Sequence, residues 1–298
     1  MSATGEYLQD GVPAGTVVLE SATRSFRVQV DTGRTLKETL LRRGGRRAVP
    51  VPTADRNAEA LRAGTPIDDH VFALRDVDLR IEPGETVALV GRNGAGKSST
   101  LRVLAGIIPL DSGAVRIGGS VAALLDLAAG FSRDFSGREN IIMGGALYGL
   151  TRAQVDERLD RIIAFSELGD FVDLPLKAYS SGMLVRLAFA IVAFLDVDVL
   201  LIDEVLAVGD GAFQRKCEAR IAEQVESGAT LVLVSHDLAL IERTCDRTVL
   251  LEGGRVSVDG PTDEVLASYR HRLEDATAPV RASAAPDAPS PDPAGGPA

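Results

Sequence analysis

The stretch that decides the fold is Gly91-Arg92-Asn93-Gly94-Ala95-Gly96-Lys97-Ser98-Ser99, which matches the pattern G-x-x-x-x-G-K-S. The apolar run Thr86–Val90 before it predicts a buried strand, and Ser98–Ala105 after it predicts a helix. In that order, glycines let the backbone wrap around phosphate groups, while successive N–H groups and the helix N-terminus point at them. A chance glycine-rich turn would not need both flanking elements, so the sequence predicts a loop that binds the phosphates of a nucleotide.

Two side chains of this loop carry the expected chemistry. Lys97 can neutralise the β- and γ-phosphates of a nucleoside triphosphate, and Ser98 can place its hydroxyl on Mg²⁺. ATP and Mg²⁺ are therefore the expected ligands of the loop.

A second apolar run, Val197–Ile202, ends in the acidic pair Asp203-Glu204. A buried strand that delivers two carboxylates at its C-terminal end is typical of nucleotide hydrolysis sites. Asp203 is expected to hold Mg²⁺ through water, and Glu204 to act as the general base on the attacking water. The alternative is a strand followed by an acidic pair that caps a helix, and the upstream phosphate loop favours the hydrolytic interpretation.

Between these two motifs lies Tyr179-Ser180-Ser181-Gly182-Met183, where the chain resembles the ATP-binding cassette (ABC) ATPases. Their signature is L-S-G-G-Q, and this chain keeps Ser180 and Gly182 but has Tyr, Ser and Met at the other positions. The resemblance implies that Ser180, Ser181 and Gly182 of one subunit close over the γ-phosphate held by the other, and hence a homodimer. A Ser-Gly turn that opens a helix is also a physical anion site, although an ordinary capped helix remains the alternative.

The resemblance continues beyond the acidic pair. His236, one of only three histidines, follows the apolar run Leu231–Val234 and matches the switch histidine that contacts the γ-phosphate. A structural or surface histidine is the alternative. Asp210 matches the aspartate of the D-loop, the segment that follows the acidic pair in these ATPases.

The resemblance implies two further site residues. Phe26 occupies the place of the aromatic residue that stacks on adenine, although it could instead be an ordinary core residue of a β-sheet. The glutamine that senses Mg²⁺ in these ATPases is not visible before Gly130-Phe131. Asp126 is the polar candidate for that metal position, with a simple strand-end acid as the alternative.

The variant motifs narrow the resemblance to one branch of the family. The signature, the segment Asp203–Asp210 and the segment Gly130–Asn140 are similar to those of ATPase subunits that export O-antigen polysaccharide or teichoic acid. The similarity covers residues 16–273. It implies an α/β fold with a P-loop (RecA-like), mostly parallel sheet core, an antiparallel β subdomain and a helical signature subdomain.

The implied function is hydrolysis of ATP to power export of a lipid-linked cell-surface polysaccharide or teichoic acid through a separate membrane permease. The ATPase subunit of another ABC transporter, for efflux or import, is an alternative. A soluble ABC ATPase of translation or DNA repair is a less favoured alternative. Those proteins have tandem cassettes or a long coiled coil, and this sequence shows neither feature.

The chain divides into three predicted segments. Residues 1–15 are expected to be a flexible N-terminus, and residues 16–273 the ATP-binding domain, with an insertion over 33–69. Residues 274–298 are rich in Ala and Pro without apolar periodicity, which predicts a disordered tail. Within the domain, Thr151 and Gln154 form a capping box that predicts a helix to about Ser166.

Composition limits the partners. The chain has 298 residues, of which 45% are hydrophobic and 25% charged, as in an ordinary globular protein. Its net charge of −10 argues against a nucleic-acid-binding surface. Two cysteines are too few for a disulfide framework and fit a reducing cytoplasm. With no expected signal peptide or membrane-spanning helix, the protein is expected to lie peripherally on the cytoplasmic face of the inner membrane, beside a permease encoded separately.

Overall fold

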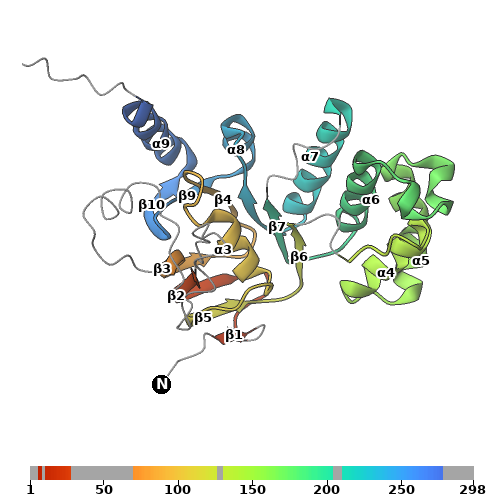
Figure 1. Cartoon of the computed structure of the whole chain (residues 1–298), viewed down its shortest axis with the longest axis horizontal. Coiled ribbons are helices and arrows are strands. Elements are labelled where there is room, and N and C mark those ends of the chain that lie inside the picture. The colour runs from red at the N-terminus through yellow and green to blue at the C-terminus, as the bar shows by residue number, and fades with distance from the viewer. Residues whose placement is uncertain (1–5, 9–10, 28–69, 126–129, 204–209, 278–298) are drawn as a thin grey trace, which may run out of the picture.

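The computed structural model describes residues 6–8, 11–27, 70–125, 130–203 and 210–277, and Figure 1 shows how their elements are arranged. The 33–69 insertion, Asp126 and Glu204 lie outside the described residues, as does most of the 274–298 segment. None of the helices in these ranges combines the length and the hydrophobicity that crossing a membrane requires.

The centre of the fold is a six-stranded sheet. In spatial order its strands are β10 (Arg255–Pro261), β9 (Arg247–Glu252), β4 (Thr86–Val90), β8 (Thr230–Val234), β7 (Val199–Asp203) and β6 (Val121–Leu124). All neighbouring strands run parallel except β10 and β9, which form an antiparallel pair. Strand β4 is buried along its whole length, as expected for a parallel strand covered on both faces.

A second, four-stranded sheet has the order β1-β5-β2-β3. Its strands are β1 (Glu6–Leu8), β2 (Val17–Arg27), β3 (His70–Ile81) and β5 (Ser112–Ile117). Strand β2 runs antiparallel to both β3 and β5, whereas β1 runs parallel to β5. Strand β1 lies within the segment 1–15, for which the sequence predicts a flexible N-terminus. The strand forms there through pairing of its backbone with Ala114–Arg116 of β5, which is distant in the sequence.

Helix α3 (Lys97–Leu104) lies between the two sheets. Its Leu101 and Leu104 are fully buried and belong to one core cluster with Leu74 of β3 and Leu89 of β4. The phosphate loop therefore leads into a helix that packs in the core. Helices α7 (Gly211–Glu226), α8 (Leu238–Thr244) and α9 (Thr262–Thr277) follow the later strands of the core.

Helices α4 (Gly137–Leu147), α5 (Arg152–Ser166) and α6 (Ser181–Ala193) form a separate helical part at the β6 edge of the six-stranded sheet (Figure 1). Two short 3₁₀ helices, η1 (Gly169–Asp173) and η2 (Leu176–Ala178), join α5 to α6. The predicted capping box of Thr151 and Gln154 opens α5, and an equivalent box of Ser136 and Glu139 opens α4.

The predicted fold class is thus confirmed: an α/β fold with a mostly parallel core sheet, an antiparallel β part and a helical part that includes α6, whose N-cap is Ser180. Helix α9 runs to Thr277, past residue 273, at which the sequence analysis ends the domain.

Candidate nucleotide site

The glycines of the phosphate loop hold a backbone that other residues would not adopt. Gly91, Gly94 and Gly96 have φ values of 147°, 80° and 111°, in the region that favours glycine. Space is also limiting, because a Cβ on Gly91 would lie 2.3 Å from the carbonyl oxygen of Leu251, and one on Gly96 would lie 2.2 Å from that of Ala73. The loop between β4 and α3 is therefore packed against neighbouring strands rather than free to change shape.

Lys97 is directed back into the loop. Its side chain is only 7% exposed, and Nζ donates hydrogen bonds to the carbonyl oxygens of Gly91 at 2.8 Å and of Arg92 at 3.3 Å. The remaining loop residues divide by exposure: Arg92, Asn93 and Gly94 are exposed, Ala95 is buried, and Ser98 and Ser99 are half-buried in the first turn of α3. The ammonium group is thus held by the backbone of a loop whose residues 92–94 are exposed, an arrangement suited to binding an anion.

The parallel register brings the other predicted residues to the same edge of the sheet. Asp203, the last residue of β7, is half-buried and pairs with Val234 of β8, which pairs in turn with Leu89 of β4. His236 is exposed two residues beyond the end of β8. Asp203, His236 and the phosphate loop therefore all follow the carboxyl ends of adjacent strands, where α/β sheets bind ligands.

Phe26 lies at the end of β2 and is 39% exposed. It pairs with Val71 of β3, two residues before Ala73, whose carbonyl oxygen abuts Gly96. Strand β3 thus pairs with Phe26 and also packs against the phosphate loop, and the guanidinium of Arg24 lies 4.8 Å from the centroid of the Phe26 ring. Its stacking on adenine stays a prediction.

The signature segment opens α6 on the helical part. Ser180 is the N-cap, and its Oγ accepts a hydrogen bond from the backbone N–H of Met183 at 3.2 Å. Ser180 and Ser181 are exposed and Gly182 is half-buried. Among the described residues, the atom nearest to a Cβ built on Gly182 is Ser180 Oγ at 3.9 Å, so packing within the chain does not require glycine there.

The structure explains the tyrosine that replaces leucine in this signature. Tyr179 is buried, and its hydroxyl donates a 2.7 Å hydrogen bond to the carbonyl oxygen of Phe171. Burial raises the pKa of the phenol, with a further contribution from the charge of Asp173. Tyr179 therefore serves as a core residue of the helical part with one satisfied polar atom.

Sequence reasoning missed an ion-pair network centred on Arg186 of α6. Arg186 of α6 donates hydrogen bonds to Glu167 and to Asp210, and its guanidinium lies 4.7 Å from the ring centroid of Phe213. Glu167 also accepts from Lys216 Nζ at 3.0 Å, and this bond, with that from Arg186, lowers the pKa of the carboxyl group. No local sequence pattern predicts that Glu167 joins this network, because its partners are distant in the sequence.

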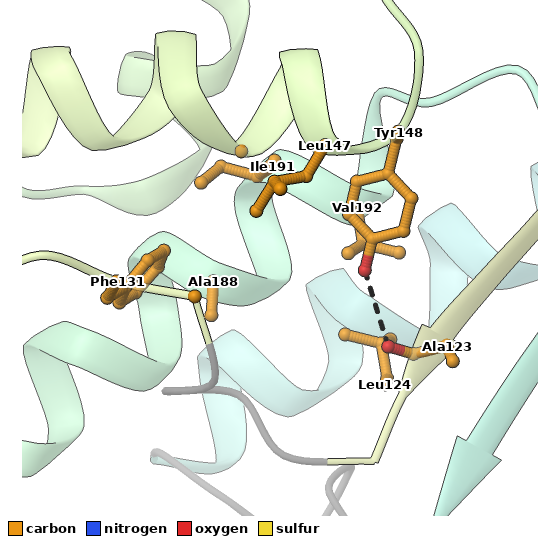
Figure 2. Close-up of a pocket in the computed structure, with 10 residues that line it drawn as sticks. Ala123, Leu124, Phe131, Leu147, Tyr148, Ala188, Ile191 and Val192 are labelled. Atoms are coloured by element: carbon orange, nitrogen blue, oxygen red, sulfur yellow. Dashed lines mark hydrogen bonds between the residues drawn. The ribbon is translucent and has the colours of Figure 1, made fainter. Parts of the chain in front are cut away.

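Figure 2 shows an apolar pocket of about 130 Å³ between the helical part and the end of β6. Leu147 and Tyr148 of the α4 C-terminus and Ile191 and Val192 of α6 line it. The Tyr148 hydroxyl donates a 3.4 Å hydrogen bond to the carbonyl oxygen of Ala123, and burial raises its pKa. Among the lining residues, Leu147 is an exposed apolar side chain, at 71%.

Comparisons with known proteins agree with this geometry. A sequence profile described as ABC transporter matches residues 74–207. The O-antigen export system ATP-binding protein RfbB of Myxococcus xanthus is 44% identical over 86% of this chain, which spans 56% of that protein's length. The ABC transporter protein AbcA of Aeromonas salmonicida is 48% identical over 69% of this chain and 67% of its own length. A teichoic acids export ATP-binding protein TagH of Levilactobacillus brevis is 39% identical over 67% of this chain and 55% of its own.

Solved structures support the fold. An ATP-binding subunit of an ABC transporter superposes with a TM-score of 0.63 at 22% identity, covering 87% of this chain and 96% of its own. A dimeric ATP-binding cassette in a post-hydrolysis state, bound to ADP and Pi, superposes with a TM-score of 0.61 at 17% identity, covering 83% and 98%. At these identities the likeness concerns the fold alone.

Proposed function

The chain belongs to the ABC transporter family, among the ATP-binding subunits of the O-antigen and teichoic acid export group, and from this membership we propose its function. It hydrolyses ATP and so powers export of a lipid-linked cell-surface polysaccharide or teichoic acid through a separate membrane permease. The observation that carries the proposal is the convergence of the phosphate loop, Asp203 and His236 at one edge of the core sheet.

Each residue has a chemical task in this proposal. The loop from Gly91 to Ser99 wraps the phosphates, and Lys97 exchanges its bonds with Gly91 and Arg92 for bonds with the β- and γ-phosphates. His236 steadies the γ-phosphate, and Glu204 accepts a proton from the attacking water. Phe26 stacks on the base.

Mg²⁺ fits the residues present. A serine hydroxyl at the start of α3 and a carboxylate at the end of β7 are hard oxygen donors of the kind that Mg²⁺ prefers, and both follow central strands of one sheet. Ser98 and Asp203 would hold the ion, with Asp126 as a further candidate. The ion would offset negative charge on the transferred phosphoryl group.

The signature serves a second copy of the chain. Ser180, Ser181 and Gly182 lie on the helical part, which Figure 1 separates from α3 across the β6 and β7 edge of the sheet. In this proposal they therefore do not contact the chain's own phosphate loop. In a homodimer they complete the partner's site. Packing within one chain does not require glycine at position 182, which is consistent with a role for Gly182 between chains.

The membrane partner is a separate permease, beside which the subunit lies on the cytoplasmic face of the inner membrane. No nucleic-acid partner is expected from a chain of net charge −10. The polymer follows from the relatives, whose names specify export of O-antigen or teichoic acids.

A genetic complementation experiment tests the proposal. Cells that lack this chain should accumulate the lipid-linked polymer internally and lose it from the surface, and the wild-type chain should restore export. A Lys97→Ala chain should not restore it, whereas Asp156→Asn, which removes only an exposed pair with Arg152 on α5, should restore it fully. Normal surface polymer in cells without the chain would contradict the export function, and export restored by Lys97→Ala would contradict the role of ATP.

A further inference from the structure

We propose that Asp111 is a positioning residue for nucleotide-base binding: it fixes the end of β2 so that Phe26 presents one ring face to the base. The inference rests on the proposed function, because it concerns the base of the ATP that the site would bind. It assigns a task to a residue that lies in neither the phosphate loop nor the acidic strand end.

Asp111 contacts the three residues that precede Phe26. Its Oδ2 accepts hydrogen bonds from both the backbone N–H and the Oγ of Ser25, each at 2.7 Å. Its Oδ1 accepts from the Arg24 guanidinium at 2.9 Å, and its own backbone N–H donates to the carbonyl oxygen of Thr23 at 2.8 Å. One residue thus fixes both the backbone and the side chains of this strand end.

The charge on Asp111 is maintained by these contacts. Partial burial would raise its pKa, but the hydrogen bonds from Ser25 and the charge of Arg24 outweigh that effect and lower it. The carboxylate is consequently ionised at neutral pH, and hydrogen bonds to an ionised acceptor are stronger than those between neutral groups.

Arg24 transmits the restraint to the aromatic ring. Its guanidinium, held by Asp111, lies 4.8 Å from the Phe26 ring centroid, within the range of a cation–π contact. The ring is still 39% exposed. With one part covered by Arg24 and the rest open, Phe26 is held as a platform on which one planar base can stack.

The position of Asp111 in the chain connects this platform to the phosphate site. Helix α3 begins at Lys97 in the phosphate loop, and Asp111 lies in the connection from the end of α3 to β5. The same segment therefore binds phosphates at one end and fixes the base platform at the other. Ala73 of β3 abuts Gly96, so the strand that pairs with Phe26 also packs against the phosphate loop.

A matched pair of variants isolates the effect. Asp111→Ala removes the contacts to Arg24 and Ser25, and Phe26→Ala removes the ring. Glu20→Gln is the control, because Glu20 and Arg116 form a comparable 3.0 Å ion pair between β2 and β5 away from Phe26. For each full-length protein, the dissociation constants of ATP and of inorganic tripolyphosphate are measured at equilibrium, the second by competition.

We expect Phe26→Ala to weaken ATP binding about tenfold, in the range measured for base–aromatic stacking, and Asp111→Ala about three- to tenfold. Tripolyphosphate binding should not change in either variant, since it has no base. The double variant should bind ATP as Phe26→Ala does, because Asp111 acts through the ring. Glu20→Gln should match the wild type with both ligands.

The outcomes separate this inference from the proposed function. Weaker ATP binding in Phe26→Ala with wild-type binding in Asp111→Ala would overturn the role of Asp111 and leave the base platform intact. Weaker tripolyphosphate binding in Asp111→Ala would also overturn it, because Asp111 would then act through α3. Loss of ATP binding only in Lys97→Ala would show a nucleotide site without a Phe26 platform. Should Asp111→Ala melt below the assay temperature, Asp111→Asn and Arg24→Gln provide the same comparison.

Discussion

The guanidinium of Arg186 donates a hydrogen bond to the carboxylate of Asp210 and so joins α7 to α6, the helix whose signature is proposed to complete a partner subunit's site. Arg186 lies on α6, whose N-cap is the signature residue Ser180. Asp210 is the N-cap of α7, where its Oδ1 accepts from the backbone N–H groups of Ala212 and Phe213 at 3.0 Å. These bonds to the helix N-terminus, together with Arg186, lower the pKa of Asp210. The signature helix α6 and the N-terminus of α7 are therefore tied together by side-chain contacts.

Replacing Arg186 by Gln should slow hydrolysis without weakening ATP binding to the isolated subunit. The expected loss is roughly 10- to 100-fold in kcat, since a misplacement of about 1 Å in a catalytic group can cost about 10²-fold. Arg158→Gln is the matched control, because Arg158 is similarly enclosed and pairs with Asp196 on the same helical part. Equal kcat values for the two variants would rule out a special role for the Arg186–Asp210 contact.

Replacing Glu204 by Gln should preserve the binding of MgATP and slow its hydrolysis by about 10²–10⁴-fold, the usual loss when a general base is removed. The variant keeps the shape of the side chain, so we expect an ATP-bound dimer to accumulate. Size-exclusion chromatography with and without ATP, together with steady-state phosphate release, measures both effects. Near-normal turnover would remove Glu204 from the proposed mechanism.

Replacing Lys97 by Ala should instead weaken ATP binding itself, by tenfold or more, because it removes a charge directed at the phosphates. Lys97→Arg should not restore affinity, since the side chain is only 7% exposed and the larger guanidinium has little room between the carbonyl groups of Gly91 and Arg92. Isothermal titration with ATP measures the change. Unchanged affinity in Lys97→Ala would count against the phosphate-loop assignment.

Replacing Ser180 by Arg should abolish hydrolysis while the isolated subunit still binds ATP, because a bulky cation at the α6 N-terminus would block contact with the partner's γ-phosphate. A mixture of Ser180→Arg and Lys97→Ala chains should recover part of the activity. In that mixed dimer both lesions lie in one composite site and the other site is intact. Loss of ATP binding by the Ser180→Arg monomer would show that the signature acts within its own chain.

The parts of the fold that are readable from the sequence are those encoded locally. The strand Thr86–Val90 and the capping box at Thr151 are found where the sequence predicts them, because burial of a short apolar run and N-capping involve neighbouring residues. Helix α4 could have been predicted in the same way, because Ser136 and Glu139 form a capping box at its start, but the sequence analysis assigned no helix there.

The contacts that join distant segments are not readable in this way. Glu167 adopts a left-handed conformation, with a φ of 57°, at the C-terminus of α5, and its partners Arg186 and Lys216 come from two later helices. The parallel pairing of β1 with β5 and the bonds from Asp111 to β2 likewise depend on how the chain folds back. Only tertiary packing decides these contacts, so spacing and composition gave no sign of them.

Tyr179 has a consequence for how this cassette can change over evolutionary time. Its hydroxyl occupies the space beside Gly137, so close that a Cβ on Gly137 would lie 2.3 Å from the oxygen. That Cβ would also lie 2.9 Å from the carbonyl oxygen of Val172, so a leucine at position 179 would remove only one of two obstacles at position 137. The carbonyl of Phe171 would lose the tyrosine hydroxyl and keep the backbone N–H of Leu174 as its donor. Position 137 at the start of α4 is therefore expected to stay glycine even in relatives that carry leucine at position 179, because the backbone of Val172 imposes the restriction independently of the signature.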